Sequence, residues 1–360
     1  MKIVNTSLNT NPMLSAFAGF DWRRALFFDI ETTGLNHRRS HLYLIGALWL
    51  SGNTFCLRQW FAEKPGDEAA ILQDFLRLAS GLSRLIHYNG SSFDLPYLIH
   101  KCAFYGFDPS PVKIEGCDLY TRFRPLKPWL AAEDLKLKSM ERAVGLHRKD
   151  RCTGKELIGL YKEWLRTGGP QLLELLLLHN REDVTGMVEI QRLFSLLALQ
   201  NGALPLAPDG REDGPDSLAL RFIPAETLPL ALSVQKDGIS LSAQNSRITL
   251  RLPKYHGELR LFFPDYRNYY YLPREDRAIH KSVAVYVDPV YRQKATPDTC
   301  CERRLGTFLP QYQDSFTPIF RENRGDKTSY FLYDQKLLEN EDGLAAYAAQ
   351  MIQSLLNRKI

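Results

Sequence analysis

The 360-residue sequence lacks the features that would indicate several special classes of protein. Its six cysteines include no Cys-x-x-Cys pair, so we expect reduced thiols rather than a zinc or disulfide framework. No internal repeat or low-complexity tract is visible, which argues against a solenoid or a largely disordered chain. No apolar run approaches the roughly 18 residues needed to cross a bilayer, and the amino terminus has no signal-peptide pattern. We therefore predict a cytoplasmic protein that does not contact a membrane.

The composition is that of a globular protein with a modest positive charge. Hydrophobic residues make up 44% and aromatic residues 11% of the chain, enough for sizeable cores. At about 100–200 residues per domain, this length predicts two domains. The net charge of +5 permits an anionic partner without requiring one. Positive charges concentrate between residues 118 and 155, where they could serve phosphates or form a solvated basic face.

The first 200 residues have the pattern of an α/β domain. Apolar runs and helical spacing alternate, with Ser51-Gly52-Asn53 as a hairpin turn. Strands are expected at residues 25–30, 42–50, 54–61 and 84–88, and helices at residues 68–79 and 93–105. This order predicts a mixed sheet with flanking helices, because the fourth strand needs a helical crossover to return beside the first.

A change in composition near residue 200 predicts a domain boundary. Residues 208–215 are rich in Pro, Gly and Asp and sustain neither a helical nor a strand period. Beyond them, alternating strands and a closing helix at residues 343–358 indicate a smaller α+β domain. The predicted organisation is an amino-terminal extension (1–24), an α/β domain (25–200), a linker (201–227) and a carboxy-terminal α+β domain (228–360).

Two acids share one face of the first strand. In residues 27–35, Phe-Phe-Asp-Ile-Glu-Thr-Thr-Gly-Leu, Asp29 and Glu31 are two apart and point the same way. Two carboxylates at the end of a buried strand repel each other unless they are paired or bind a cation. Hard oxygen ligands at close quarters suit Mg²⁺ or Mn²⁺, so the strand predicts a divalent cation site.

Two later motifs add further acids. Asp94 stands where a strand ends and a helix begins, a position where sites collect, although a helix-capping acid would also stand there. His179 and Asp183 are four apart on a predicted helix and share one face. Taken alone, a surface hydrogen bond or a buried histidine would explain that pair. Glu182 is expected to point away and to be solvated.

Together, the acids Asp29, Glu31, Asp94 and Asp183 resemble the four acids of the DEDD exonuclease superfamily. The first motif, Asp-Ile-Glu-Thr-Thr-Gly, is the most specific, and Asn89 precedes Phe93 and Asp94 at the spacing of the second motif. The likeness covers about residues 25–199 and is greatest to bacterial YprB-type ribonuclease-H-like proteins. It implies a ribonuclease-H-like sheet and a 3′–5′ exonuclease that hydrolyses DNA or RNA into nucleoside monophosphates.

The resemblance also implies roles for individual residues. Asp29 would hold both of two Mg²⁺ or Mn²⁺ ions, Glu31 and Asp183 the ion beside the attacking water, and Asp94 the water shell of the second ion. A single-stranded 3′ end would contact residues of the first two motifs, namely Thr32, Thr33, Gly34, Leu35, Asn89 and Phe93. From the residues alone, Leu35 is either an apolar wedge or an ordinary packed side chain, and Asn89 either a substrate contact or a turn residue.

His179 departs from the pattern of that superfamily. The third motif there has a Tyr four residues before the last Asp or a His five before it, whereas His179 stands four before Asp183. An imidazole is shorter than a phenol and titrates near neutrality. We expect His179 to be catalytic, either as a base or by holding the attacking water through another water, with a slow site as the alternative.

Two other functions fit the same residues. A structure-selective endonuclease of this fold would use the same ions, and a nucleic-acid-binding module would keep the fold with a weakened site. In any of these, basic residues could follow a bound strand. The candidates are Arg122, Arg124, Lys127, Lys136, Lys138, Arg148, Lys149 and Arg151. The sequence leaves protein partners open, and for the carboxy-terminal domain it is compatible with substrate gripping, partner docking or dimerisation.

Overall fold

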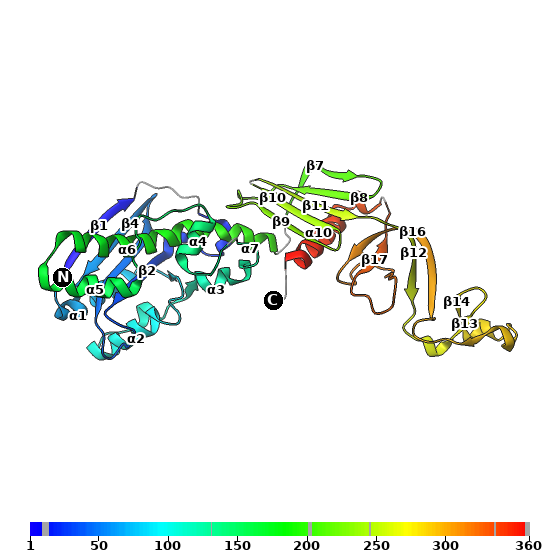
Figure 1. The fold of residues 1–360 in the computed structure, drawn as a ribbon, viewed down its shortest axis with the longest axis horizontal. Helices are drawn as coiled ribbons and strands as arrows, with labels where there is room; N and C mark the ends of the chain where they lie inside the picture. Colours follow the sequence, from blue (N-terminus) through cyan, green and yellow to red (C-terminus); the bar gives the residue numbers. More distant parts are fainter. Residues whose placement is uncertain (9–13, 131, 201–203, 245, 335, 357–360) are drawn as a thin grey trace. The chain divides into compact units, whose positions relative to one another are not determined.

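The computed structural model describes residues 1–8, 14–130, 132–200, 204–244, 246–334 and 336–356. The chain divides into two compact units, Met1–Leu197 and Ala198–Ile360 (Figure 1). In the described residues, no helix is both long and apolar enough to cross a membrane.

A six-stranded mixed sheet forms the centre of the first unit, with strand order β1-β4-β3-β2-β5-β6. Its strands are β1 (Lys2–Leu8), β2 (Ala25–Thr32), β3 (Leu42–Ser51), β4 (Thr54–Phe61), β5 (Arg84–His87) and β6 (Gly116–Asp118). The first four strands pair antiparallel, whereas β5 pairs in parallel with both β2 and β6. The predicted mixed sheet is therefore confirmed, including the return of the fourth predicted strand beside the first.

Helices cover both faces of this sheet. The helices of residues 1–200 are α1 (Glu68–Ala79), α2 (Asp94–Tyr105), α3 (Leu119–Phe123), α4 (Leu137–Ala143), α5 (Gly154–Thr167), α6 (Pro170–Ile190) and α7 (Phe194–Gln200). On one face, the ring of Phe28 lies 5.5 Å from that of Phe75 in α1. On the other face, α6 contacts β2, β3 and β4, and α5 lies beside α6 (Figure 1). The acids of β2 alternate with Phe28 and so face α6.

The amino-terminal residues show one difference from the sequence prediction. Residues 1–24 were expected to be an extension, but β1 pairs with β4 along its whole length, from Lys2 opposite Phe61 to Leu8 opposite Phe55. The strand lies at the edge of the sheet and is only half-buried, with exposed and partly buried positions alternating from Asn5 onward. Such a strand lacks the continuous apolar run that marked β2.

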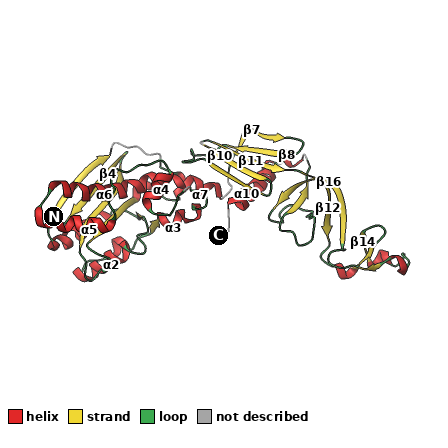
Figure 2. Ribbon diagram, in the orientation of Figure 1, coloured by secondary structure: helices red, strands yellow, loops and turns green. Residues whose placement is uncertain are grey.

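The second unit consists of separate antiparallel sheets with a few helices (Figure 2). The sheets have strand orders β7-β8-β11-β10-β9, β12-β16-β17 and β14-β13-β15. The strands are β7 (Leu206–Asp213), β8 (Ser217–Phe222), β9 (Leu232–Lys236), β10 (Ile239–Gln244), β11 (Arg247–Pro253), β12 (Tyr255–Phe262), β13 (Tyr269–Leu272), β14 (Arg277–His280), β15 (Gln293–Lys294), β16 (Cys301–Gln311) and β17 (Ser329–Leu332). The helices are α8 (Lys281–Ala284), α9 (Lys336–Glu339) and α10 (Glu341–Leu356). This composition agrees with the predicted α+β class.

The segment predicted as a linker, residues 201–227, contains β7 and β8, so the expectation that it sustains no strand is wrong. Pro208 and Gly210 are tolerated because β7 is an edge strand whose register with β8 shifts between Leu206 and Arg211. Residues 201–203 lie outside the described part of the chain, as do residues 357 and 358, which we had included in the closing helix.

Candidate active site

Strand β2 presents Asp29 and Glu31 on the face that α6 covers. Opposite them on β3 stand Gly46 and Leu44, respectively. The register between β2 and β3 shifts between Glu31 and Thr32, the last residue of β2 that pairs with β3. Both acids are partly buried, since they lie under the helix rather than at the open surface. The period of two residues in a strand thus places both carboxylates at the junction of sheet and helix.

Asn180 of α6 fixes the position of Asp29. Its Nδ2 donates to Asp29 Oδ2 at 3.0 Å, and its Oδ1 accepts from Gln59 Nε2 of β4 at 2.9 Å. Gly46 makes room for this amide, because a Cβ at that position would lie 2.1 Å from Asn180 Oδ1. Asn180 and Gln59 were not predicted. A glycine in the middle of an apolar strand was the one available signal, since it marks a close approach.

The imidazole of His179 is buried among three carboxylates. Its Nε2 lies 3.1 Å from Asp183 Oδ2 and 3.6 Å from Glu31 Oε1. Its Nδ1 lies 2.8 Å from Oδ2 of Asp150, an acid that the sequence analysis did not single out. One donor atom each from Glu31, His179 and Asp183 fall within 4.8 Å of one another, close enough to bind a single metal ion. Asp29 and Asp94 lie outside this closest group.

The loop before α5 supports the acids of α6. Arg148 forms ion pairs with Asp183 and Glu141, and its side chain is only 6% exposed. Glu182, expected to be solvated, instead accepts the backbone N–H groups of Lys149 at 3.1 Å and Asp150 at 2.9 Å. The proposal that Arg148 follows a bound strand is therefore wrong, because this guanidinium points inward.

Asp94 begins helix α2, where Phe93 is the N-cap residue. Burial raises the pKa of Asp94 to about 7, and the charges of Asp118 and Asp183 add to this shift. The charge of Asp94 in turn raises the pKa of Asp29 and of Glu31. The junction of β5 and α2 therefore brings the third predicted acid into the electrostatic reach of the first two.

The acids of the site crowd negative charge into a desolvated space. Burial, followed by the charges of Asp183 and Glu31, raises the pKa of Asp29 well above its usual range. Burial likewise raises the pKa of Glu31 to about 8, although the charge of His179 opposes this. Burial acts in the same direction on Asp183, but the hydrogen bond from His179 and the charge of Arg148 outweigh it and lower the pKa. A divalent cation would favour the ionised form of all these groups.

The pKa of His179 is also raised, which for an imidazole favours the charged form. Burial opposes the charged imidazole, but the hydrogen bond to Asp183 and the charges of Asp183, Glu31 and Asp150 together raise its pKa. In the absence of a metal ion, the imidazolium therefore partly neutralises the carboxylates around it.

The last residue of β2 and the loop after it contain four of the predicted substrate contacts. Thr32 Oγ1 donates to the carbonyl of Gly34 at 2.9 Å, and Thr33 Oγ1 accepts from the N–H of His41 at 2.9 Å. These bonds use the hydroxyl groups within the loop and hold its shape. Leu35 is 84% exposed, so it is not an ordinary packed residue.

The other two predicted contacts lie before α2. Asn89 is exposed, has φ of 59°, and donates its backbone N–H to Asp118 Oδ1 at 2.8 Å. Phe93 lies with its ring 5.5 Å from that of Tyr97 and packs against the core. The turn conformation that we left open for Asn89 is thus present, and its amide side chain is free to face solvent.

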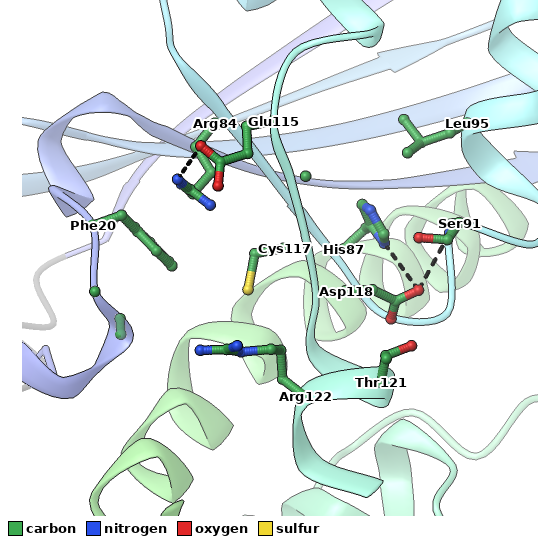
Figure 3. Close-up of a pocket in the computed structure, with 13 residues that line it drawn as sticks. Phe20, Arg84, His87, Ser91, Leu95, Glu115, Cys117, Asp118, Thr121 and Arg122 are labelled. Atoms are coloured by element: carbon green, nitrogen blue, oxygen red, sulfur yellow. Dashed lines mark hydrogen bonds and ion pairs between the residues drawn. The ribbon is translucent and has the colours of Figure 1, made fainter. Parts of the chain in front are cut away.

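A cavity of about 610 Å³ is lined by Ser91 of this loop and by Cys117 and Asp118 of β6 (Figure 3). Asp118 faces both Ser91 and His87 there, with Oδ2 at 3.4 Å from the backbone nitrogen of Ser91 and 3.7 Å from His87 Nδ1. Phe20 and Arg122 also line it. None of the four acids borders this cavity, so it is separate from the acidic site.

Comparison with known proteins agrees with the fold. Residues 26–195 match the RNase_H superfamily. The chain is 28% identical over 176 residues to the uncharacterized protein YprB of Bacillus subtilis (strain 168). The aligned residues are 48% of this chain and 42% of that protein. The chain thus spans less than half the length of this relative. Together with the mixed sheet and its flanking helices, the match identifies an RNase H-like domain and confirms the predicted fold class.

Solved structures with partial similarity include two nucleic-acid enzymes. The family B DNA polymerase from the hyperthermophilic archaeon Pyrobaculum calidifontis has a TM-score of 0.40 and 15% identity, over 68% of this chain and 35% of that one. A product-bound exonuclease I has a TM-score of 0.33 and 13% identity, over 92% of this chain and 71% of that one. At this level of similarity neither structure defines an activity for this chain.

Proposed function

We propose that this chain is a metal-dependent nuclease of the DEDD type that removes nucleotides from the 3′ end of DNA or RNA. The observation that carries the proposal is the convergence of Asp29, Glu31, Asp94 and Asp183 from one strand and two helices of an RNase H-like domain. The match of residues 26–195 to the RNase_H superfamily supports a nuclease. The DEDD assignment rests on the motifs in the sequence.

The donor set fits divalent cations. The four acids would hold Mg²⁺ or Mn²⁺, and we propose two ions. Burial and mutual repulsion raise the pKa values of Asp29, Glu31 and Asp94, and the charge of His179 offsets only part of this at Glu31. When bound, the ions would act as Lewis acids that stabilise negative charge developing on the scissile phosphate. His179 would act on the ion held by Glu31 and Asp183, because its imidazole lies beside both carboxylates. Asn180 would keep Asp29 oriented through its hydrogen bond.

The substrate would be a single-stranded 3′ end that lies against the two loops beside the acids. Leu35 offers an exposed apolar side chain suited to contact a base, and Asn89 offers an exposed amide. Thr32 and Gly34 would contribute mainly by holding the shape of the loop, because the Thr32 hydroxyl already donates to Gly34. The Thr33 hydroxyl accepts from His41, so its own O–H can still donate to a substrate. Phe93, which packs inward, would support the terminal nucleotide from below.

A nucleic-acid-binding module with a weakened site is the second candidate. The observation that favours it is Arg148, whose guanidinium already neutralises part of the charge of Asp183. A cation bound near Asp183 would then be held less strongly than in a site without this arginine.

The test is digestion of 5′-labelled single- and double-stranded DNA and RNA with Mn²⁺ or Mg²⁺. Wild type should produce a ladder of single-nucleotide steps from a free 3′ end. Asp29→Asn should lower the rate by more than about 100-fold, because it changes a direct ion ligand. Glu174→Gln, at an exposed position of the same helix α6, is the matched control and should digest at the wild-type rate.

Other results would select an alternative. Equal cleavage of linear strands and closed circles would indicate the endonuclease. Binding of the labelled strands without any cleavage would indicate the weakened module. Full activity in Asp29→Asn would remove these acids from the reaction.

A further inference from the structure

The three donor atoms nearest each other in the site are spaced as neighbouring ligands of one ion. Ligands of an octahedral ion at about 2.1 Å lie roughly 3 Å apart along each edge of the octahedron. His179 Nε2 lies 3.1 Å from Asp183 Oδ2 and 3.6 Å from Glu31 Oε1. The separation of Nε2 from Asp183 Oδ2 is that of a direct contact, so no water fits between these two atoms.

The two carboxylate oxygens of Asp183 have different partners. Oδ1 pairs with Arg148 Nη1, whereas Oδ2 faces His179 Nε2. Arg148 itself is held by Glu141, a buried acid on α4. The arginine therefore fixes the carboxylate from one side and leaves the other oxygen directed at the site.

The second ring nitrogen of His179 is held from behind. Nδ1 contacts Asp150 Oδ2 at 2.8 Å, and that oxygen also accepts from Lys138 Nζ at 2.7 Å. Asp150 Oδ1 accepts the backbone N–H of Cys152 at 2.9 Å, and the residue is 7% exposed. A bound metal ion would displace the proton of Nε2, and an imidazole whose Nδ1–H is directed at a carboxylate then presents the lone pair of Nε2 to the other side.

This arrangement is that of a metal-binding histidine. Such residues usually donate the ring N–H that faces away from the metal to a carboxylate or carbonyl, which fixes the ring and its tautomer. We propose that His179 Nε2 is a direct ligand of the divalent ion held by Glu31 and Asp183, and that Asp150 is the positioning residue for this imidazole. The inference rests on the proposed metal-dependent function, and it turns an all-oxygen site into one with a nitrogen ligand.

A nitrogen ligand changes which ion the site prefers. Carboxylates and water suit Mg²⁺ and Mn²⁺ alike, but Mg²⁺ accepts a nitrogen ligand less readily than Mn²⁺, the first metal of a series whose later members prefer imidazole. The chain should therefore select Mn²⁺ over Mg²⁺ more strongly than a variant whose remaining ligands are all oxygens.

The experiment is pulsed electron paramagnetic resonance of Mn²⁺ bound to the full chain, with Mn²⁺ affinity measured by calorimetry. Wild type should show ¹⁴N coupling from a directly bound imidazole. His179→Gln should lose this coupling and much of its preference for Mn²⁺ over Mg²⁺. Asp150→Asn should keep the coupling at saturating Mn²⁺ but bind the ion about 10- to 100-fold more weakly, the usual cost of losing an outer carboxylate.

His147→Gln is the matched control, because His147 is an exposed histidine of the same loop as Asp150. It should retain both the ¹⁴N coupling and the wild-type affinity. Circular dichroism of each variant checks that the fold is kept, and Asp150→Asn tests the arrangement even if His179→Gln does not fold.

The inference fails if wild-type Mn²⁺ shows no ¹⁴N coupling, or if the coupling persists in His179→Gln. That outcome leaves the nuclease proposal intact, since the digestion by wild type and Asp29→Asn decides it separately. If wild type and Asp29→Asn bind Mn²⁺ equally weakly and neither digests a strand, the inference and the proposed function both fail.

Discussion

Gly46 controls the position of Asp29 from the neighbouring strand. The glycine stands opposite Asp29 on β3 and opposite Gln59 on β4, and the amide of Asn180 fills the space above it. A side chain there would push this amide away from Asp29. One missing side chain in the sheet thus determines how a helix residue orients an acid.

We expect Gly46→Ala to destabilise the protein by about 1–3 kcal/mol, the usual cost of overpacking a filled core. The substitution should also weaken Mn²⁺ binding, because Asn180 can no longer hold Asp29. Urea unfolding and Mn²⁺ calorimetry measure the two effects.

Gly159→Ala is the control for this substitution. Gly159 lies within α5 and is exposed, and no atom of the described residues comes within 4 Å of where its Cβ would be. Alanine there should be neutral or stabilising by about 0.5–1 kcal/mol. Equal effects of the two substitutions would show that Gly46 does not position Asn180.

Single residues of the site were predictable where the signal is local. Strand periodicity placed Asp29 and Glu31 on one face, and helical spacing placed His179 beside Asp183. Asp150 escaped prediction because it meets His179 from 29 positions away in the chain, and nothing near either residue indicates the contact. The functional roles of all these residues stay predictions until the digestions are done.

At the scale of elements, three adjacent residues of the loop before α5 bind side chains of helix α6. Residues 148–150 provide a guanidinium to Asp183, a carboxylate to His179 and two backbone N–H groups to Glu182. Helix α6 also accommodates Glu141, since a Cβ on Gly186 would lie 1.7 Å from Glu141 Oε1. The loop and α4 therefore form one support for the acidic end of the site.

Arg148→Met should be strongly destabilising. It leaves Glu141, whose side chain is 1% exposed, buried without its partner, and breaking a buried pair from one side typically costs about 3–5 kcal/mol. The double variant Arg148→Met/Glu141→Leu should recover most of this loss, because no buried charge is then left unpaired. A double-mutant cycle from urea unfolding gives the coupling. If the losses in free energy of unfolding of the two single variants simply added in the double variant, the ion pair between Arg148 and Glu141 would not be what stabilises the fold.

The elements that the sequence did not reveal share a physical cause. β6 has only three residues, too few for a period, and β7 contains Pro208 and Gly210. Each is tolerated because it lies at the edge of its sheet, where one side of the strand needs no hydrogen-bonded neighbour. The long apolar strands β2 and β3, whose burial leaves a continuous pattern, were predicted near their observed bounds.

At the scale of the whole molecule, the buried acids make stability depend on pH. The pKa of Glu31 is about 8 against an ordinary 4.5, and that of Asp94 about 7 against 3.8. The folded state therefore binds these protons more tightly than the unfolded state. The stability that they contribute is complete below the ordinary values and is lost as the pH rises through 7 to 8.

The metal-free protein should accordingly lose thermal stability between about pH 5 and pH 9, and Mn²⁺ should restore more of it at the upper end. Melting curves in EDTA and in Mn²⁺ across this range measure the effect. Glu31→Gln should flatten the EDTA curve, since the amide does not titrate. A rise in melting temperature from Mn²⁺ that is equal at both ends would contradict the assignment of these acids to an ion site.

The whole-chain prediction held for the fold class because the strongest patterns belong to the first unit. Its continuous apolar strands and amphipathic helices are separated by clear turns. The sheets of the second unit, such as β12 paired with the long β16, depend on contacts between distant segments, so only their class could be predicted.

The functional residues of α6 depend on supports from other parts of the chain, which limits how this site can be engineered. A transplant of the helix onto a different RNase H-like scaffold would carry His179, Asn180 and Asp183 but leave their supports behind. Without a glycine at position 46, the amide of Asn180 has no room beside the sheet. Without residues 148–150, His179 and Asp183 lose the side chains that orient them. The smallest portable unit is therefore discontinuous, drawn from three separate stretches of the chain.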